Sequence, residues 1–587
     1  MGKPSSSHDL HATASVSRPE RLTVAAESLI AHPLFAYLAI VVLQLRFMWR
    51  IWDYKDMTAG DTSYYYLLAL DWAQHLHDTW FSPLYTNYFG TVLWFFDDVE
   101  TAVLVHRMLV VVAATILVLA VARALLGPAL GLLVAVWWAV VPANFNIDYE
   151  VHLFGFLPVL AAVFVVARWP SRVGRGIALG LLAGTMTLAR NELVIAVLIF
   201  AAALVATEIR QRRTTTVAVA SYLKCYGIPL LVVALLTFGA LWQSPDHGRH
   251  VRQEMADHHG LNMCQVYAFN YQQRHPTEFT GNPFTDCAPL MRRQFGKSYP
   301  SFFEEARANP SALKDFVAWN AHLTPIGLQV ALFGATSRGS NPGYYPVKTF
   351  ERYAAVLTLI ALAIVAAGLA LAWRERAYWR AQLTAKAWPV LLLLALSTTA
   401  VAVALTQRPR AEYIYGLTLT LMLLTAACVG VILRRVGVLR VVAPIAAVGT
   451  LLLILALPSY YRQAPRPLHD ALQRLDDVRP VLRRPGAVLV TSGYNWEICA
   501  YLAKSFQQHC SSPSWLGVQS QIQRGKSVQR ILDDTRATVI YADPVARLDP
   551  AFVSYLKSAR AAANWRTVRS GTDRYGDWSV LVRRDSA

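Results

Sequence analysis

The chain has 587 residues, of which 55% are hydrophobic and only 16% are charged. In soluble domains roughly a quarter of the residues are charged, so this deficit indicates an integral membrane protein. The formal net charge is +18, but Lys and Arg gather at the ends of apolar runs, a pattern typical of membrane orientation. A nucleic-acid partner is not expected, because it would require one continuous basic face.

The first 32 residues are polar and contain neither an apolar run nor a small-residue cleavage site. We interpret residues 1–32 as a disordered cytoplasmic tail rather than a cleaved signal peptide. Lys3, Arg18 and Arg21 precede the first apolar run and are expected to hold this end of the chain inside.

The next region, residues 33–458, contains about eleven apolar runs that predict transmembrane helices. In chain order these runs are Leu34–Trp52, Ala102–Ala122, Ala129–Ala143, Leu153–Ala167, Ile177–Ala189, Leu193–Ala206, Tyr226–Trp242, Ala354–Trp373, Trp388–Leu405, Ile414–Leu433 and Val441–Leu457. Several are shorter than the ideal of about 20 residues, so their ends must extend into flanking polar residues.

The loops between these runs predict the topology. With the N-terminus in the cytoplasm, every inside loop is basic, whereas the short outside turns carry acids. The agreement across five inside loops favours a multi-pass protein of the plasma (inner) membrane. Its N-terminus is then cytoplasmic and its C-terminal domain extracytoplasmic.

Three larger segments face outside in this topology, namely residues 53–100, 243–350 and 459–587. The last is predicted to be a small α/β domain, because apolar strand runs alternate with helical runs. Its expected elements, in order, are a strand Ala487–Thr491, a helix Trp496–Phe506, a strand Thr538–Tyr541, a helix Phe552–Ala563 and a strand Trp578–Val582.

Four of the six cysteines fall in outside segments as two local pairs. Cys264 and Cys287 share the long second segment, and Cys499 and Cys510 share the C-terminal domain. This distribution suits an oxidising compartment and predicts two disulfides, with four free thiols as the alternative.

The segment that follows the first run contains Asp61, Tyr64 and Tyr65. It places a carboxylate at the water interface beside aromatic rings that suit the stacking of sugars. The alternative is that Asp61 only caps the next helix, since the first turn of a helix favours acids.

The turn between the third and fourth runs contains Asp148, Glu150 and His152. Two acids followed by a His can hold a divalent metal or bind a polar substrate. The alternative is an ordinary solvated turn between helices.

Two further outside turns contain arginines. Arg190 and Glu192 form a tight charged turn next to the hydrocarbon, where ionisable groups are costly and point to function, although a simple ion pair is the alternative. Arg408 and Arg410 precede Tyr413 and lie on the outside, against the positive-inside rule. An anionic phosphate would explain them, and contact with lipid headgroups is the alternative.

All of these clusters lie on one membrane face, where carboxylates and arginines together suit a lipid-phosphate donor. The Gly60-Asp61…Tyr64-Tyr65 segment, the Asp148-Tyr149-Glu150 turn, the Arg190-Asn191-Glu192 turn and the Arg408…Tyr413 segment resemble the motifs of the GT-C superfamily of membrane glycosyltransferases. The layout of about eleven spans with an outside C-terminal domain is also similar to that superfamily.

The resemblance implies inverting transfer of a sugar from a polyprenyl-phosphate or polyprenyl-diphosphate donor to a hydroxyl acceptor on a glycan, lipid or protein. Asp61 is then the catalytic base. The substrate-binding residues implied are Tyr64, Tyr65, Asp148, Glu150, Arg190, Glu192, Arg408, Arg410 and Tyr413. A divalent metal, Mg²⁺ or Mn²⁺, would be held by Asp61, Asp148 and Glu150.

The chain departs from the oligosaccharyltransferase branch of the superfamily, because its C-terminal domain lacks the Trp-Trp-Asp-Tyr-Gly motif that binds peptides. Ser63 stands where a second acid would follow Asp61, which leaves metal dependence open. Two other functions remain as alternatives. One is a transporter or flippase of lipid-linked sugars, although no internal repeat is visible. The other is a non-catalytic assembly subunit of the membrane.

Overall fold

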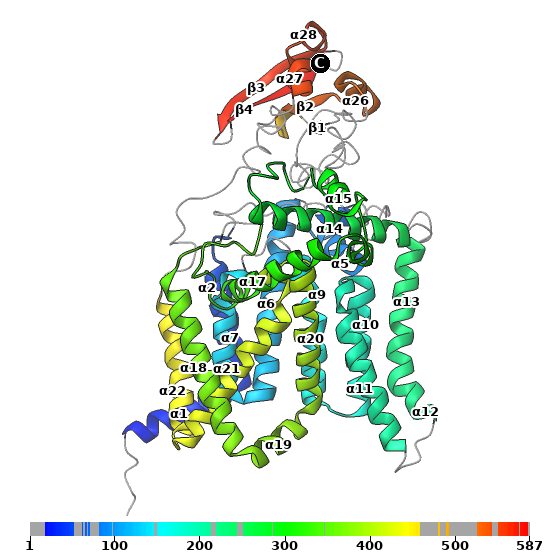
Figure 1. Cartoon of the computed structure of the whole chain (residues 1–587). Helices are drawn as coiled ribbons and strands as arrows, with labels where there is room; N and C mark the ends of the chain where they lie inside the picture. Colours follow the sequence, from blue (N-terminus) through cyan, green and yellow to red (C-terminus); the bar gives the residue numbers. More distant parts are fainter. Residues whose placement is uncertain are drawn as a thin grey trace, which may run out of the picture.

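The structure is a computed structural model of the chain. It describes residues 18–51, 62, 65–66, 68–70, 82–96, 98–145, 150–212, 219–243, 251–284, 286–344, 347–457, 479–481, 489–491, 525–542, 550–573 and 576–584. Long helices run side by side in a bundle, shorter helices lie across one end of it, and a small sheet lies beyond them (Figure 1).

Each of the eleven predicted spans corresponds to a helix of the bundle. The helices are α2 (Pro33–Met48), α6 (Val99–Leu126), α7 (Pro128–Val140), α9 (Glu150–Arg168), α10 (Arg172–Leu188), α11 (Val194–Arg212), α13 (Ile228–Gln243), α18 (Arg352–Arg374), α20 (Ala387–Thr406), α21 (Tyr415–Arg435) and α22 (Leu439–Ala456).

Within the described ranges, eight helices are long and apolar enough to cross a membrane, and a ninth is added if the bent pair that contains α2 is one span. The remaining two, α7 and α10, have 13 and 17 residues and are shorter than an ideal span. The prediction of a polytopic helical membrane protein is therefore confirmed.

The first described helix, α1 (Arg18–Ala31), bends by 81° into α2 and leaves the bundle at the end opposite the sheet (Figure 1). Arg123, in the last turns of α6, donates hydrogen bonds to the carbonyl oxygens of Ile30 (2.9 Å) and Ala31 (3.1 Å). A cation at these carbonyls satisfies the last acceptors of α1 and complements its dipole. The bend is thus fixed by a partner from another helix.

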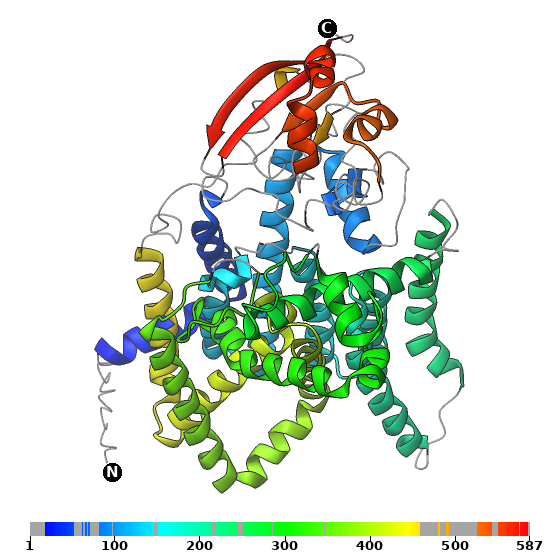
Figure 2. The same ribbon diagram turned by 45° about the horizontal axis from the view of Figure 1, so that its top comes forward.

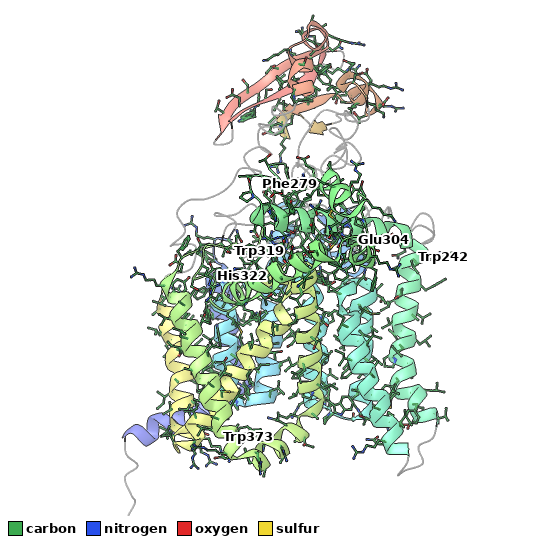
Figure 3. All side chains as sticks on the ribbon, in the orientation of Figure 1. Trp242, Phe279, Glu304, Trp319, His322 and Trp373 are labelled. Atoms are coloured by element: carbon green, nitrogen blue, oxygen red, sulfur yellow. A yellow bond between two sulfur atoms is a disulfide. The ribbon has the colours of Figure 1, made fainter. Side chains whose placement is uncertain are left out.

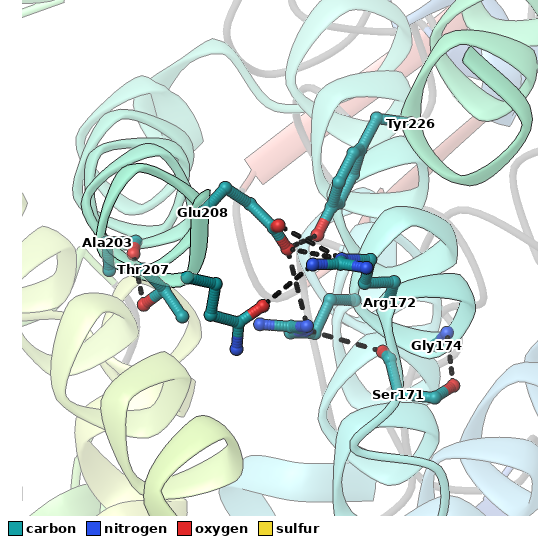
Figure 4. A network of polar contacts seen from close by, with 9 residues as sticks. Ser171, Arg172, Gly174, Ala203, Thr207, Glu208 and Tyr226 are labelled. Carbon is teal, nitrogen blue, oxygen red and sulfur yellow. Dashed lines mark hydrogen bonds and ion pairs between the residues drawn. The ribbon is translucent and has the colours of Figure 1, made fainter. Parts of the chain in front are cut away.

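At the same end of the bundle, Glu208 ties three helical segments together (Figure 4). Its carboxylate accepts hydrogen bonds from Arg172 of α10 (3.0 Å) and from the hydroxyl of Tyr226 (2.8 Å), and Arg175 lies 3.4 Å away. Tyr226 belongs to a π-helical turn, η2 (Leu223–Gly227), which leads from α12 (Val219–Tyr222) into α13. A β-carbon on Gly176 would lie 1.8 Å from the carbonyl oxygen of Cys225, so only glycine permits this approach.

Four helices of the long outside segment form a layer across the other end of the bundle (Figure 2). They are α14 (Val251–Arg274), α15 (Cys287–Phe295), α16 (Phe302–Ala308) and α17 (Pro310–Phe333). The predicted Cys264–Cys287 disulfide joins α14 to α15, which confirms that prediction. The amide of Asn320 donates to the carbonyl oxygens of Leu405 and Gln407, both at 3.0 Å, and so holds α17 against the end of α20.

The C-terminal domain contains a four-stranded sheet in the order β1-β2-β4-β3. Its strands are β1 (Leu489–Thr491), β2 (Val539–Ala542), β3 (Trp565–Asp573) and β4 (Gly576–Arg583), and only the β1–β2 pair is parallel. The three strands expected from the sequence are therefore present. Sequence patterns missed β3 and the helix α26 (Val528–Asp534).

The helix expected over Phe552–Ala563 is two helices, α27 (Pro550–Leu556) and α28 (Ala559–Asn564). The break occurs because the hydroxyl of Ser558 accepts a hydrogen bond from the backbone N–H of Ala561 and caps a new helix. The helix expected over Trp496–Phe506 and the pair Cys499 and Cys510 lie outside the described residues.

Candidate active site

Two polar clusters occupy the end of the bundle beneath the outside layer. The first, called the Glu150 cluster, consists of Tyr66, Tyr85, His106, Arg107 and Glu150. Oε2 of Glu150 lies 2.8 Å from the hydroxyl of Tyr66, 3.1 Å from that of Tyr85 and 2.9 Å from Nε2 of His106. Oε1 is paired with the guanidinium of Arg107. The carboxylate is fully buried, so these partners replace its hydration.

Local sequence explains why these side chains meet. Glu150 is the first residue of α9, where the positive end of the helix dipole favours a carboxylate. His106 and Arg107 lie two turns inside α6, and Tyr85 belongs to the short helix α5 (Pro83–Leu93). His106 and Arg107 were not predicted as site residues from the sequence. The available signal was an ionisable pair within an apolar run, which points to function by default.

The Glu150 cluster joins the two segments that carry the predicted carboxylates. Asp61, Tyr64 and Asp148 lie outside the described residues. Asp61 precedes Tyr66 by five positions, and Asp148 precedes Glu150 by two. Tyr65 is buried and packs edge-on against Tyr85, with ring centroids 5.4 Å apart.

A metal ion does not fit at Glu150 in this arrangement. Oε2 already has three hydrogen-bond partners, and the charge of Arg107 lies against Oε1, where it would repel a cation. The described residues include no group of three or more metal-binding side chains. The metal prediction for Asp61 and Asp148 stays a prediction, since both residues lie outside the described ranges.

The second cluster, called the arginine cluster, consists of Arg190, Arg408, Arg410 and the acids Glu192 and Glu412. It also contacts the rings of His152 and Tyr413. Arg190 donates to Glu192 through Nε (2.6 Å) and to Nε2 of His152 through Nη1 (2.9 Å). An arginine has no acceptor, so His152 accepts here and must be in a neutral form.

The rings of the arginine cluster connect two turns that are distant in the sequence. His152 and Tyr413 have ring centroids 4.6 Å apart. The guanidinium carbons of Arg190 and Arg410 lie 5.9 Å and 4.3 Å from the centre of the Tyr413 ring. Tyr413 ends the short helix η3 (Ala411–Tyr413). Burial raises the pKa of Tyr413 to about 12, so its hydroxyl keeps its proton at neutral pH and remains a donor.

Arg408 and Arg410 are enclosed by protein and have exposed fractions of 1% and 2%. Arg408 donates to the carbonyl oxygen of Asn341 (2.8 Å), and its guanidinium lies over the rings of Phe269 (5.1 Å) and Tyr344 (4.9 Å). These contacts come from the long outside segment, namely from α14 and from the chain after α17. They disfavour the alternative that the two arginines face lipid headgroups.

A cavity of about 60 Å³ lies between the arginine cluster and the interior of the bundle. Its polar lining consists of His152, Arg190, Glu192, Thr399, Glu412, Tyr413 and Tyr415. Its apolar lining comes from α9, α20 and α21 and from the turn before α11, and includes Phe156, Val159, Leu193, Leu396 and Ala400. Gly155 faces the stem of Arg190, where a β-carbon would lie 2.6 Å from its Cγ.

Comparison by sequence gives no match, since no family model and no curated protein matches the chain. Comparison by structure finds the oligosaccharyltransferase of Archaeoglobus fulgidus among the similar solved structures. AglB in complex with an inhibitory peptide and a dolichol-phosphate has a TM-score of 0.42 and 13% identity, over 96% of this chain and 75% of that chain.

Two further structures of the Archaeoglobus fulgidus enzyme are similar to the same degree. The complex with Zn and sulfate has a TM-score of 0.41 and 15% identity, over 92% of this chain and 72% of that chain. The form tethered by a disulfide bond to an acceptor peptide with an NVT sequon has a TM-score of 0.41 and 13% identity, over 93% and 73%. Likeness of this low degree leaves the function to be argued from the residues of this chain.

Proposed function

We propose that this chain is an inverting glycosyltransferase that moves a sugar from a polyprenyl-phosphate or polyprenyl-diphosphate donor to a hydroxyl acceptor outside the membrane. The observation that carries the proposal is the two-sided lining of the cavity. Arg190, His152, two glutamates and the protonated Tyr413 form one side, and apolar residues of three spans form much of the rest. A lipid phosphate is a ligand with this combination of charge and hydrocarbon.

The donor phosphate would bind at Arg190, the one arginine of the cluster that lines the cavity. Its side chain retains 14% exposure, and Glu192 and His152 fix its orientation. The cluster contains the ion pairs Arg190–Glu192 and Arg410–Glu412, of which the first lies at the cavity. Arg408 and Arg410, predicted from sequence to grip the phosphate, are proposed instead to support Tyr413 and the turn that holds it.

The acceptor hydroxyl would be activated by Asp61. In this step the carboxylate takes the hydroxyl proton while the acceptor oxygen attacks the anomeric carbon of the sugar. The bond from that carbon to the phosphate oxygen breaks, and the released phosphate charge is stabilised by Arg190 and the hydroxyl of Tyr413. The Tyr66–Glu150 hydrogen bond would restrict the segment that carries Asp61. No step depends on a metal.

The orientation proposed for the chain places the two clusters and the C-terminal domain outside and the N-terminus in the cytoplasm. Reporter fusions after Arg213 and after Arg380 are then expected to be cytoplasmic, and a fusion near Pro300 external. An opposite result at any of these sites contradicts the orientation.

Sugar transfer is tested by incubating the purified protein with radiolabelled polyprenyl-phosphate and polyprenyl-diphosphate sugars and membrane acceptors. We expect one donor to yield labelled product and the variant Arg190→Lys to need more of that donor. Lys retains the charge but cannot contact a phosphate through two parallel hydrogen bonds. Binding of a donor without turnover would favour an assembly subunit, and movement of the donor across vesicles without transfer would favour a transporter.

A further inference from the structure

A short helix at the end of the bundle opposite the candidate active site connects two spans directly. This helix, α19 (Arg376–Ala385), begins immediately after Glu375, the single residue that follows α18. It ends before Lys386, the residue that precedes α20. With one residue at each joint, α19 cannot move away from the ends of the two spans.

The lengths of the two spans fix the level of α19. At 1.5 Å per residue, the 23 residues of α18 and the 20 residues of α20 measure about 35 Å and about 30 Å. The hydrocarbon core of a bilayer is about 30 Å thick, so α19 lies at the level of the lipid headgroups. Trp373, in the last turn of α18, is 74% exposed at this level (Figure 3), as expected of an interfacial tryptophan.

The charged residues around α19 are positive, with a single exception. Arg374, Arg376 and Arg380 belong to α18 and α19, and Arg434 and Arg435 end α21. Glu375 is the only acid among these positions, and it lies 3.7 Å from Arg434 and 3.8 Å from Arg435. The guanidinium of Arg434 also lies 3.7 Å from the ring centre of Tyr378, which fixes it against α19.

Two arginines of this group, Arg376 and Arg380, belong to α19 itself. They are four positions apart, so they lie on the same face of α19. Both side chains are exposed, and neither has an acidic partner among the residues that the structure describes. None of the residues of α19 is buried, so much of its surface faces lipid or water.

We infer that α19 and the end of α21 bind the phosphate groups of anionic phospholipids in the leaflet at this end of the protein. Arg376 and Arg380 would contact one headgroup from two sides, and Arg434 and Arg435 would add to the local potential. Basic residues near an anionic membrane surface are attracted to it. This inference does not depend on the sugar-transfer proposal, because it concerns the opposite end of the bundle.

The test uses the full chain in detergent with added phosphatidylglycerol, phosphatidylcholine or inorganic phosphate, and counts bound lipid by native mass spectrometry. We expect selective retention of phosphatidylglycerol and a higher midpoint of thermal unfolding only with that lipid. The double variant Arg376→Gln/Arg380→Gln should bind it roughly 10- to 30-fold more weakly. The control Arg292→Gln/Arg293→Gln, on exposed residues of α15 at the other end, should bind normally.

Three outcomes would overturn the inference. Equal retention of phosphatidylcholine and phosphatidylglycerol would show that charge is not recognised. Stabilisation by inorganic phosphate alone would point to a free anion rather than a lipid. An α19 variant that is folded and still retains phosphatidylglycerol as well as the α15 control would show that these two arginines are not the site.

Discussion

The hydroxyl of Tyr66 donates a 2.8 Å hydrogen bond to Glu150, a carboxylate with no exposed surface at the first residue of α9. This contact links the segment after the first span to the turn before α9, and each segment carries one of the predicted carboxylates. The four partners of Glu150 suggest that it positions these segments rather than contacting substrate or metal itself.

Replacing Glu150 with Gln tests this positioning role. The change leaves Arg107 buried without a countercharge, which typically costs 3–5 kcal/mol. We therefore expect a marked loss of thermal stability in detergent, measured by intrinsic fluorescence, together with a loss of transfer. Tyr66→Phe is the matched milder variant, since it removes one hydrogen bond of about 1 kcal/mol.

The Tyr66→Phe variant separates positioning from simple stability. If Tyr66 restricts the segment of Asp61, turnover should fall in folded protein while the Michaelis constant for the donor stays unchanged. Normal turnover in folded Tyr66→Phe protein would show that this hydrogen bond does not position the base.

The arginines of the second cluster are expected to differ from one another. Arg190 lines the cavity and Arg408 does not, being enclosed by Asn341, Phe269 and Tyr344. Arg190→Lys should raise the apparent Michaelis constant for the donor by about tenfold, whereas Arg408→Lys should mainly lower thermal stability. Both quantities are measured on the same purified variants.

A second variant, at Gly155 of α9, tests the same cavity. A β-carbon on Gly155 would meet the stem of Arg190, so Gly155→Ala should mimic Arg190→Lys without removing any charge. If folded Gly155→Ala and Arg190→Lys proteins both use the donor normally, the cavity is not the phosphate site.

Glu304 and Glu305 are neighbouring acids in α16, and we expect their contributions to stability to depend on pH in opposite directions. Glu305 is fully buried, and neither of its oxygens has a hydrogen-bond partner among the described residues. Burial raises its pKa from 4.5 to about 8. The folded protein therefore holds a proton that the unfolded chain releases between these values. The contribution of Glu305 to stability should fall as the pH rises from about 4.5 to about 8.

Glu304, the next residue, provides the control. Lys297 and Ser301 lower its pKa from 4.5 to about 2. Its contribution is therefore present above about pH 4.5 and is lost as the pH falls toward 2. Thermal unfolding at pH 5 and pH 8 should show Glu305→Gln stabilised mainly at pH 8 and Glu304→Gln destabilised at both. A Glu305→Gln variant with the pH profile of the wild type would contradict the burial argument.

Much of the bundle was predictable because its signal is local. Apolar runs located all eleven helices, and the positions of Cys264 and Cys287 located a disulfide. The C-terminal domain was less predictable, because β3 runs over Trp565–Asp573 with five exposed polar or charged residues and no clear alternation. The hydrophobic pattern also predicted one helix across Ser558, where the cap formed by Ser558 separates two helices.

The candidate site was predicted only in part, because its contacts join residues far apart in the chain. Sequence patterns identified Arg190 and Tyr413, which do meet, through a cation–π contact. They did not identify Arg107 and His106 as partners of Glu150, since pairing across 43 and 44 positions has no local signature. They also left open whether Arg408 faces lipid or protein, which depends on how the outside layer folds over it.

Asp61 is the residue on which the proposal of an enzyme depends most. A hydroxyl acceptor is a poor nucleophile until a base takes its proton, and general-base catalysis contributes about 10²–10⁴-fold. Asp61→Asn preserves size and hydrogen bonding but removes basicity, so we expect folded, membrane-inserted protein with transfer lowered by about that factor. Initial rates with labelled donor measure the loss, and Asp61→Glu should retain some activity.

The same substitution distinguishes catalysis from helix capping. Asn and Asp are comparable N-caps, so Asn should serve almost as well as Asp if residue 61 only caps a helix. A pH–rate profile adds a second readout, because loss of a general base should also remove the acidic limb of the profile. Near-normal transfer by Asp61→Asn would make Asp148 the next candidate base, since Asp148 lies two residues before Glu150 and that glutamate is already occupied by Arg107.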